Sequence, residues 1–284
     1  MLKCCLQTNT IMWLMLLSFC QNVYAKETLT LAVHPFLSPV EIEKRFTPLV
    51  NYLSLQSGFN IILKIGSNYE EHIEYIGTDK VDIAYMGPVS YVKLVNLYGL
   101  KPILAKLEVN GQSFFQGVFI VRKDSNIKSL AELKKKRIAL GNTNSTMSFI
   151  VPHYQLHQTG IINDKIIVNQ PLATHEDIAL AVLSGDFDVG AVKPAVFKSY
   201  QAYGLRLLAK TPKISEHLFV TSSKLPQKQI QILREILINM KNSNDGLAVL
   251  QGIKKDISAL VPATDSDYTN LKAIISAEEY LHSH

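Results

Sequence analysis

Apolar residues follow two patterns along the chain: short continuous runs, and longer stretches with helical spacing. Runs of about five apolar residues are typical of buried strands, and amphipathic stretches of about ten residues are typical of helices. Strands are expected at 29–33, 60–64, 81–86, 101–107 and 114–121, with helices at 41–55, 69–76 and from 88 to about 97. This alternation predicts an α/β chain with parallel sheets.

The alternation begins again near residue 130. Helices are expected at 130–136, 145–160 and 175–184, and strands at 137–140, 165–168, 187–192 and 205–209. After residue 218 the pattern changes to an amphipathic helix over 229–240 and a helical tail. No Pro- or Ser-rich linker separates the two halves. We therefore expect two lobes joined by continuous strands, with crossings near 115–122 and 208–220.

The first 25 residues have the pattern of a secretory signal peptide, which would place the mature protein in the periplasm. Lys3 is followed by an apolar run at 11–19 that is short for a membrane span, and cleavage is expected after Ala25. A competing interpretation makes Cys20 a lipidated N-terminus. Phe19 argues against it, because a lipoprotein signal has a small residue at that position.

Composition and charge exclude several kinds of site and partner. With 47% hydrophobic and 19% charged residues, the chain has the composition of a globular protein. The three cysteines (Cys4, Cys5 and Cys20) all precede the expected cleavage site, which excludes a disulfide, a cysteine nucleophile and a cysteine metal site in the mature chain. Loss of Lys3 would lower the net charge from +5 to +4. The basic run 134–137 reads as a solvated helix end, so no nucleic-acid partner is expected.

A hydroxyl-rich run at 141–148 (GNTNSTMS) joins a predicted strand to a predicted helix. Such a junction offers free backbone N–H groups and the positive end of the helix dipole. Ser145, Thr146 and Ser148 would add hydroxyl donors at the same place, so the run is typical of a small oxyanion site. The alternative is that one of these hydroxyls only caps the helix. The run alone does not decide between the two.

Four segments taken together resemble a known family. They are LTLAV at 29–33 with its following proline, VDIAYMGPVSYV at 81–92, the long stretch 117–152 that contains the hydroxyl run, and HEDIALAVLSGDFDVGAV at 175–192. They resemble type II periplasmic solute-binding proteins, and in particular the phosphate/phosphite/phosphonate-binding proteins that serve ABC importers. The resemblance covers residues 29 to about 260.

The resemblance implies a two-lobe α/β fold with a hinge and a ligand cleft between the lobes. The signal peptide would occupy 1–25 and the first lobe 26–117. The second lobe would occupy 118–212, and 213–284 would return to the first lobe and end in helices. The resemblance also implies ligand-binding residues: Ser145, Thr146, Ser148, Tyr69 and His175, with Ser90 and Tyr91 as secondary candidates at the cleft edge.

Two positions depart from the best-known phosphonate binders of this family. Phe115 stands where those proteins carry a second aromatic hydroxyl. Lys193, followed by Pro194 and Ala195, stands where they carry a carboxylate that meets the ligand's amine. A site without that acid should not favour an aminoalkyl phosphonate, and Lys193 would favour a more anionic ligand if it faces the cleft.

The histidines point to ligand binding rather than to metal chemistry. His175 would begin a helix, where protonation is disfavoured, so we expect a neutral donor. His34 lies in a loop that borders the cleft in this fold. His153 and His157 have helical spacing but no third ligand, so neither a metal nor a cofactor is expected. No Gly-x-Ser-x-Gly motif and no nucleotide-binding glycine loop is present, so an enzyme is not expected.

The sequence therefore predicts a monomeric periplasmic binding protein for phosphate, phosphite or a phosphonate. It would present this ligand to the membrane permease of an ABC importer. An alternative with the same fold is a ligand-sensing module that acts with a membrane sensor protein. An exported hydrolase is the third and least supported hypothesis.

Overall fold

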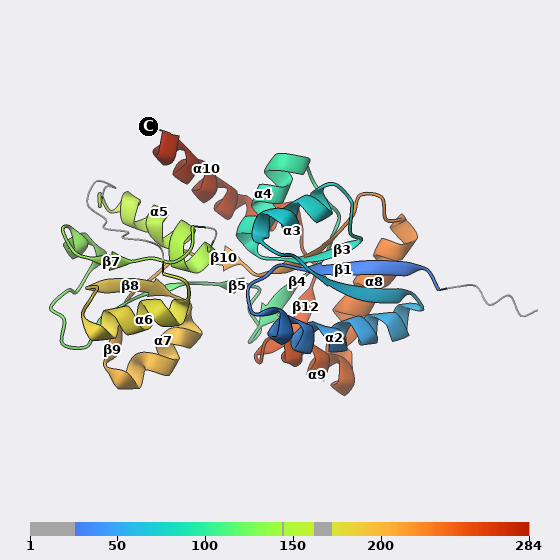
Figure 1. Cartoon of the computed structure of the whole chain (residues 1–284), viewed down its shortest axis with the longest axis horizontal. Helices are drawn as coiled ribbons and strands as arrows, with labels where there is room; N and C mark the ends of the chain where they lie inside the picture. The colour runs from blue at the N-terminus through green and yellow to red at the C-terminus, as the bar shows by residue number, and fades with distance from the viewer. Residues whose placement is uncertain (1–25, 144, 162–171, 284) are drawn as a thin grey trace, which may run out of the picture.

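The computed structural model describes residues 26–143, 145–161 and 172–283. Within these ranges the chain forms two α/β lobes side by side, each built on its own sheet (Figure 1). The strand expected at 165–168 lies outside the described residues. None of the helices in the described ranges is both long and apolar enough to cross a membrane.

The first lobe contains a six-stranded sheet in the order β12-β4-β11-β3-β1-β2. The strand β1 is parallel to β2 and β3, whereas β11 and β12 return from the last quarter of the chain and pair antiparallel. The strands are β1 (Thr28–Val33), β2 (Asn60–Ile65), β3 (Ile83–Met86), β4 (Ile103–Val109), β11 (Leu218–Thr221) and β12 (Ile257–Val261).

Helices cover both faces of this sheet. Alternate residues of β1 point to opposite faces, so Leu31 packs in one core with α2, α8 and α9, while Ala32 packs in another with α4 and α10. The helices are α2 (Pro39–Ser57), α3 (Tyr69–Gly77), α4 (Pro88–Tyr98), α8 (Gln227–Asn239), α9 (Asn244–Ile253) and α10 (Thr269–Ser283), with helical turns η5 (Met240–Asn242) and η6 (Asp265–Tyr268).

The ends of α2 show how closely local sequence sets these elements. The Ser38 side chain accepts a hydrogen bond from the backbone of Glu41, and Pro39 occupies the first helical position. Gly58 ends the helix with φ of 79°, a left-handed conformation that glycine adopts without strain. The helix therefore extends two residues beyond each end of the range 41–55 expected from the sequence.

The second lobe contains a four-stranded sheet in the order β7-β8-β6-β9. Here β7 and β8 are parallel, and β6 pairs antiparallel with β8 and β9. The strands are β6 (Val118–Arg122), β7 (Ile138–Ala139), β8 (Val189–Val192) and β9 (Leu205–Lys210). One face is covered by η1 (Leu130–Leu133) and α5 (Val151–Gln158), and the other by α6 (His175–Ser184), α7 (Pro194–Tyr200) and η4 (Gln201–Tyr203).

Two chain segments cross between the lobes. The strand β5 (Phe114–Phe115) pairs antiparallel with β10 (Ile214–Ser215) in a separate two-stranded ladder. Gly117 donates its backbone N–H to Thr211 Oγ1 over 2.7 Å, and the Thr211 N–H donates back to the Gly117 carbonyl over 3.0 Å. The crossings therefore run side by side (Figure 1) and form a paired hinge.

A third connection comes from α10. This helix leaves the first lobe and reaches α5 of the second lobe (Figure 1). His153 Nδ1 on α5 meets Glu278 Oε2 on α10, and both side chains are buried. Thus the lobes share a buried polar contact outside the hinge.

The structure corrects several sequence expectations. Both sheets are mixed rather than parallel, because β6 and β11, which arrive from the other lobe, and also β12 pair antiparallel with their neighbours. The expected helical tail contains the strand β12, a short apolar run that pairs with the edge strand β4. The expected helix at 130–136 is only the turn η1, and the strand at 114–121 is interrupted after Phe115, at the hinge.

Candidate functional site

The hydroxyl run forms a helix start with an unusual first turn. After β7, the chain enters a single π-helical turn, η2 (Thr146–Ile150), which continues into α5. Ser145 Oγ accepts hydrogen bonds from the Ser148 backbone N–H over 3.2 Å and from Ser148 Oγ over 2.7 Å. The Ser145 hydroxyl therefore caps the helix. The π-turn that follows it is of a kind that occurs often at functional sites.

The capping role leaves Ser145 able to donate. A hydroxyl offers one proton and two acceptor positions, and both bonds from Ser148 use acceptor positions. The Ser145 proton is then available to a ligand, and accepting two bonds polarises it. Thr146, at the first helical position, is half-buried and has no intrahelical acceptor for its N–H. The two interpretations of the run are therefore compatible.

Gly141 makes room for this arrangement. A Cβ at Gly141 would lie 2.2 Å from Ser148 Oγ and 2.8 Å from Ser148 Cβ, so no larger residue fits without moving Ser148. The Gly141 N–H also donates to the Ser148 carbonyl over 2.8 Å. The glycine and the third hydroxyl are thus packed as one unit.

His175 lies at the start of α6, where Thr174 and Asp177 form a capping box. Its Nδ1 accepts a hydrogen bond of 3.2 Å from the Lys193 backbone N–H. Burial, helped by the nearby Lys193 charge, lowers the pKa of His175 to about 4. The ring is therefore neutral at pH 7, with its proton on Nε2. This is the donor state expected from the sequence.

Lys193 enters the site through its backbone. Its ammonium group is exposed and lies 3.9 Å from Glu176 Oε1, a distance typical of a loose surface pair. Its N–H orients the His175 ring, and Pro194 and Ala195 are exposed at the start of α7. The structure thus assigns Lys193 a positioning contact that the sequence did not suggest.

Tyr69 lies in an aromatic wall of the first lobe. It begins α3, and its ring centroid lies 5.4 Å from that of His34. His34 is buried and its Nδ1 lies 3.1 Å from the Tyr85 carbonyl oxygen. Burial raises the pKa of the Tyr69 hydroxyl, which keeps it a neutral donor.

Two further histidines belong to this wall and were missed by sequence reasoning. The rings of His72 and His217 lie 5.8 Å and 5.9 Å from the ring of His34. Phe115 packs against His217 with a centroid separation of 5.6 Å. No local motif links positions this far apart in sequence, so only the fold could bring them together.

The structure places Tyr91 in the core of the first lobe rather than at an exposed cleft edge. Its side chain is buried in the first-lobe core, packs on the Tyr268 ring, and donates its hydroxyl proton to Asp265 Oδ1 over 2.9 Å. Because it lies one residue after Ser90 on a helix, its side chain is rotated by about 100° onto a different face. Ser90 itself is buried in the first turn of α4.

The helix start η2 meets the first lobe through a shared core. Met147 and Val151 pack in the same apolar cluster as Val89 at the start of α4, and Phe115 packs against it. This cluster brings the hydroxyl run close to the hinge and to the first-lobe wall.

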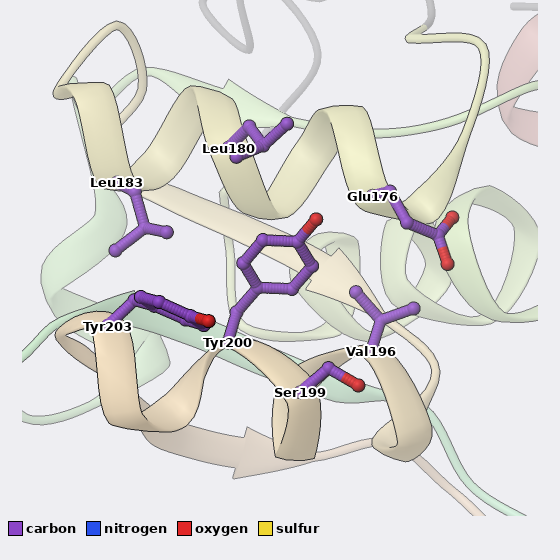
Figure 2. Close-up of a pocket in the computed structure, with 7 residues that line it drawn as sticks. All are labelled: Glu176, Leu180, Leu183, Val196, Ser199, Tyr200 and Tyr203. Atoms are coloured by element: carbon purple, nitrogen blue, oxygen red, sulfur yellow. The ribbon is translucent and has the colours of Figure 1, made fainter.

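The structure also contains an apolar groove elsewhere on the second lobe. It lies between α6 and α7, with Leu180 and Leu183 facing Tyr200 and Tyr203 (Figure 2). None of the ligand-binding residues predicted from the sequence lines it. Within the described ranges, no group of three or more His, Cys, Asp or Glu side chains is placed to hold a metal ion.

Two α/β lobes, joined by a paired hinge with polar candidates on both sides, define a periplasmic binding protein fold of type II. The family described as ABC transporter, phosphonate, periplasmic substrate-binding protein matches residues 31–268. The chain belongs to this family, whose members bind and deliver substrates for transport.

Similar proteins agree with this assignment. The chain is 26% identical over 272 residues to the phosphate-import protein PhnD of Mycolicibacterium smegmatis, covering 87% of this chain and 85% of that protein. The structure of PhnD1 from Prochlorococcus marinus in complex with methylphosphonate superposes with a TM-score of 0.74 at 22% identity, covering 89% of this chain and 98% of that one. XAC2383 from Xanthomonas citri, bound to chloride, gives 0.77 at 19% identity, covering 90% and 99%.

Proposed function

We propose that this protein captures a small phosphorus oxyanion (phosphate, phosphite or a phosphonate) between its lobes and delivers it to the permease of an ABC importer. Residues 1–25 would direct export to the periplasm and be removed. The regions 26–117 and 213–284 would then close against 118–212 about the β5–β10 hinge. The protein would act as a monomer and without catalysis.

The observation that carries this proposal is the set of neutral donors at the two helix starts of the second lobe. The Ser145 proton, the Thr146 N–H and the His175 Nε2–H are all uncharged donors. Neutral donors at helix starts suit a compact anion, because they supply directed hydrogen bonds without placing a formal charge of the protein beside the ligand. Tyr69 would complete the set from the first lobe when the lobes close.

The surroundings favour a ligand without an amine. The loop that follows β8 carries Lys193, Pro194 and Ala195 and no carboxylate. An ammonium group on the ligand would therefore lack an anionic partner in this loop. One relative is named for phosphate import, which favours transport over the sensing alternative.

A thermal-shift screen followed by calorimetry tests the proposal. The purified mature chain would be mixed separately with phosphate, phosphite, methylphosphonate, aminoethylphosphonate and sulfate. We expect stabilisation by at least one of the first three and a weaker effect of aminoethylphosphonate. Stabilisation by sulfate alone, or by none of these anions, would contradict the proposed function.

A further inference from the structure

His217 is held in one orientation by a buried carboxylate. Its Nδ1 lies 3.1 Å from Glu216 Oε2, and the same oxygen accepts the His217 backbone N–H over 3.2 Å. Glu216 is buried and its other oxygen accepts a hydrogen bond from Lys254 Nζ over 3.0 Å. Burial raises the pKa of Glu216, but the bond from His217 and the Lys254 charge outweigh it and lower that pKa to about 2. The ionised carboxylate therefore fixes the ring's Nδ1 side.

The other nitrogen of His217, Nε2, lies beside Gly87. A Cβ built on Gly87, just before α4, would lie 3.7 Å from His217 Nε2 and 3.9 Å from His34 Cε1. Because Gly87 has no side chain, the space in front of Nε2 is not filled from that side. The His217 side chain is 26% exposed, whereas His34 is 2% exposed. Of these two rings, His217 is the one that a ligand can reach more easily.

The neighbours of His217 are the candidate ligand residues of the first lobe. Its ring packs against Phe115 and against His34, and His34 packs against Tyr69. Phe115 supplies no hydrogen-bonding group, and the His34 and His72 rings of this wall are buried, so Tyr69 would face the anion with few polar neighbours. An enclosed anion with too few partners is costly. His217 stands where the missing polar group is needed.

We propose that His217 is a ligand-binding residue, whose Nε2 contacts an oxygen of the bound oxyanion from the first lobe. The contact compensates for the apolar side chain of Phe115, and Glu216 acts as the positioning residue that orients the ring. As an imidazolium, Nε2 donates to an anionic oxygen, and as a neutral ring it accepts from a P–OH group. This inference rests on the proposed function.

Calorimetry with phosphate, phosphite and methylphosphonate tests the contact on the mature chain. We expect His217→Ala to weaken the best of these ligands by about 10- to 100-fold, the scale of one hydrogen bond to a charged group. His217→Gln, which keeps a polar amide, should lose less. His157→Ala, a histidine change on the last turn of α5, is the matched control and should bind like the wild type.

A spectroscopic measurement separates contact from a structural effect. In ¹⁵N-histidine-labelled protein, the His217 Nε2 resonance should shift when the ligand is added, and His217→Ala should keep the wild-type melting temperature within a few degrees. A dissociation constant within twofold of the wild type for His217→Ala, while Ser145→Ala weakens binding, would overturn this inference alone. A wild-type protein that binds none of the three anions would overturn the proposed function as well.

Discussion

The hydroxyl of Ser145 accepts two hydrogen bonds from Ser148 and keeps one proton to offer. This geometry would let a single atom both cap the helix and bind the proposed anion. It also makes Ser148 a residue that acts largely through Ser145, since its own proton is directed there. Substitutions of the two serines should therefore not be additive.

We expect Ser145→Ala to weaken oxyanion binding by about 1–3 kcal/mol, because it removes a hydrogen bond to a charged ligand. The lost cap should also lower the free energy of unfolding by about 1 kcal/mol. Calorimetry measures the first effect and urea denaturation the second. Ser199→Ala, an exposed serine on α7, is the control and should change neither. Unchanged affinity in Ser145→Ala would contradict the proposed hydrogen bond from Ser145 to the ligand.

Gly141→Ala should damage the same unit by a steric route. The new methyl group would lie 2.2 Å from Ser148 Oγ, so the serine or the β7 end must move. Overpacking of this kind typically costs about 1–3 kcal/mol, and ligand affinity should fall with it. Gly252→Ala is the control, since nothing lies within 4 Å of its added Cβ and it lies within α9. Equal melting temperatures for the two variants would contradict this packing argument.

At the scale of single residues, the sequence predicted that the hydroxyl run lies at a helix start. It also predicted the neutral state of His175 from its position at the start of another helix. It could not predict the role of the Lys193 backbone, because that contact depends on how α6 and α7 pack. The burial of Tyr91 could not be predicted for a related reason, since helix phase turns its side chain into the core. Local pattern identifies donors, while packing decides which way they face.

At the scale of elements, α10 shows the limit of sequence periodicity. The pattern predicted helices in the tail, but not that the last helix would pack on α5 of the other lobe. The buried polar pair His153–Glu278 lies at this contact, and its two members are 125 positions apart. The same limit explains why β12 was missed, as its partner strand β4 lies far back in the chain.

The His153–Glu278 pair should be costly to break. Glu278→Leu leaves a buried histidine without its carboxylate partner, and loss of one member of a buried pair costs about 3–5 kcal/mol. Glu278→Gln, which keeps an oxygen acceptor, should cost less. Glu235→Gln on the exposed face of α8 is the control for a simple change of charge. Urea denaturation that gives the same stability for Glu278→Leu and Glu235→Gln would contradict a stabilising role for this contact.

At the scale of the whole molecule, buried neutral histidines link stability to pH. Burial lowers the pKa of His72 and of His175 to about 4, and burial with nearby His72 and His217 lowers that of His34 well below its usual value. In the unfolded chain these rings titrate near pH 6.5, so between about pH 6.5 and 4 the unfolded state binds protons that the native state does not. The free energy of unfolding should therefore fall as the pH falls through this window.

Urea denaturation between pH 7.5 and 4.5 measures this dependence. Each such histidine contributes up to about 1.4 kcal/mol per pH unit. His72→Leu should give a shallower slope, because it removes one buried ring whose nitrogens lack hydrogen-bond partners. The carboxylates Glu71 and Glu216, with pKa values of about 2, contribute only at lower pH. Stability that stays constant from pH 7 to 4.5 would exclude this origin.

The contact of α10 with α5 has a consequence for how movement of the lobes can be observed. If the buried His153–Glu278 pair persists when the protein opens, the edge that carries α10 stays fixed and the opposite edge, with α2 and α7, moves furthest (Figure 1). Fluorescent reporters on Val40 and Lys198, both exposed, would then register opening, whereas a pair across α5 and α10 would stay silent. Beyond residue 25 the chain has no cysteine, so such dyes could be attached through two introduced thiols without competing labels.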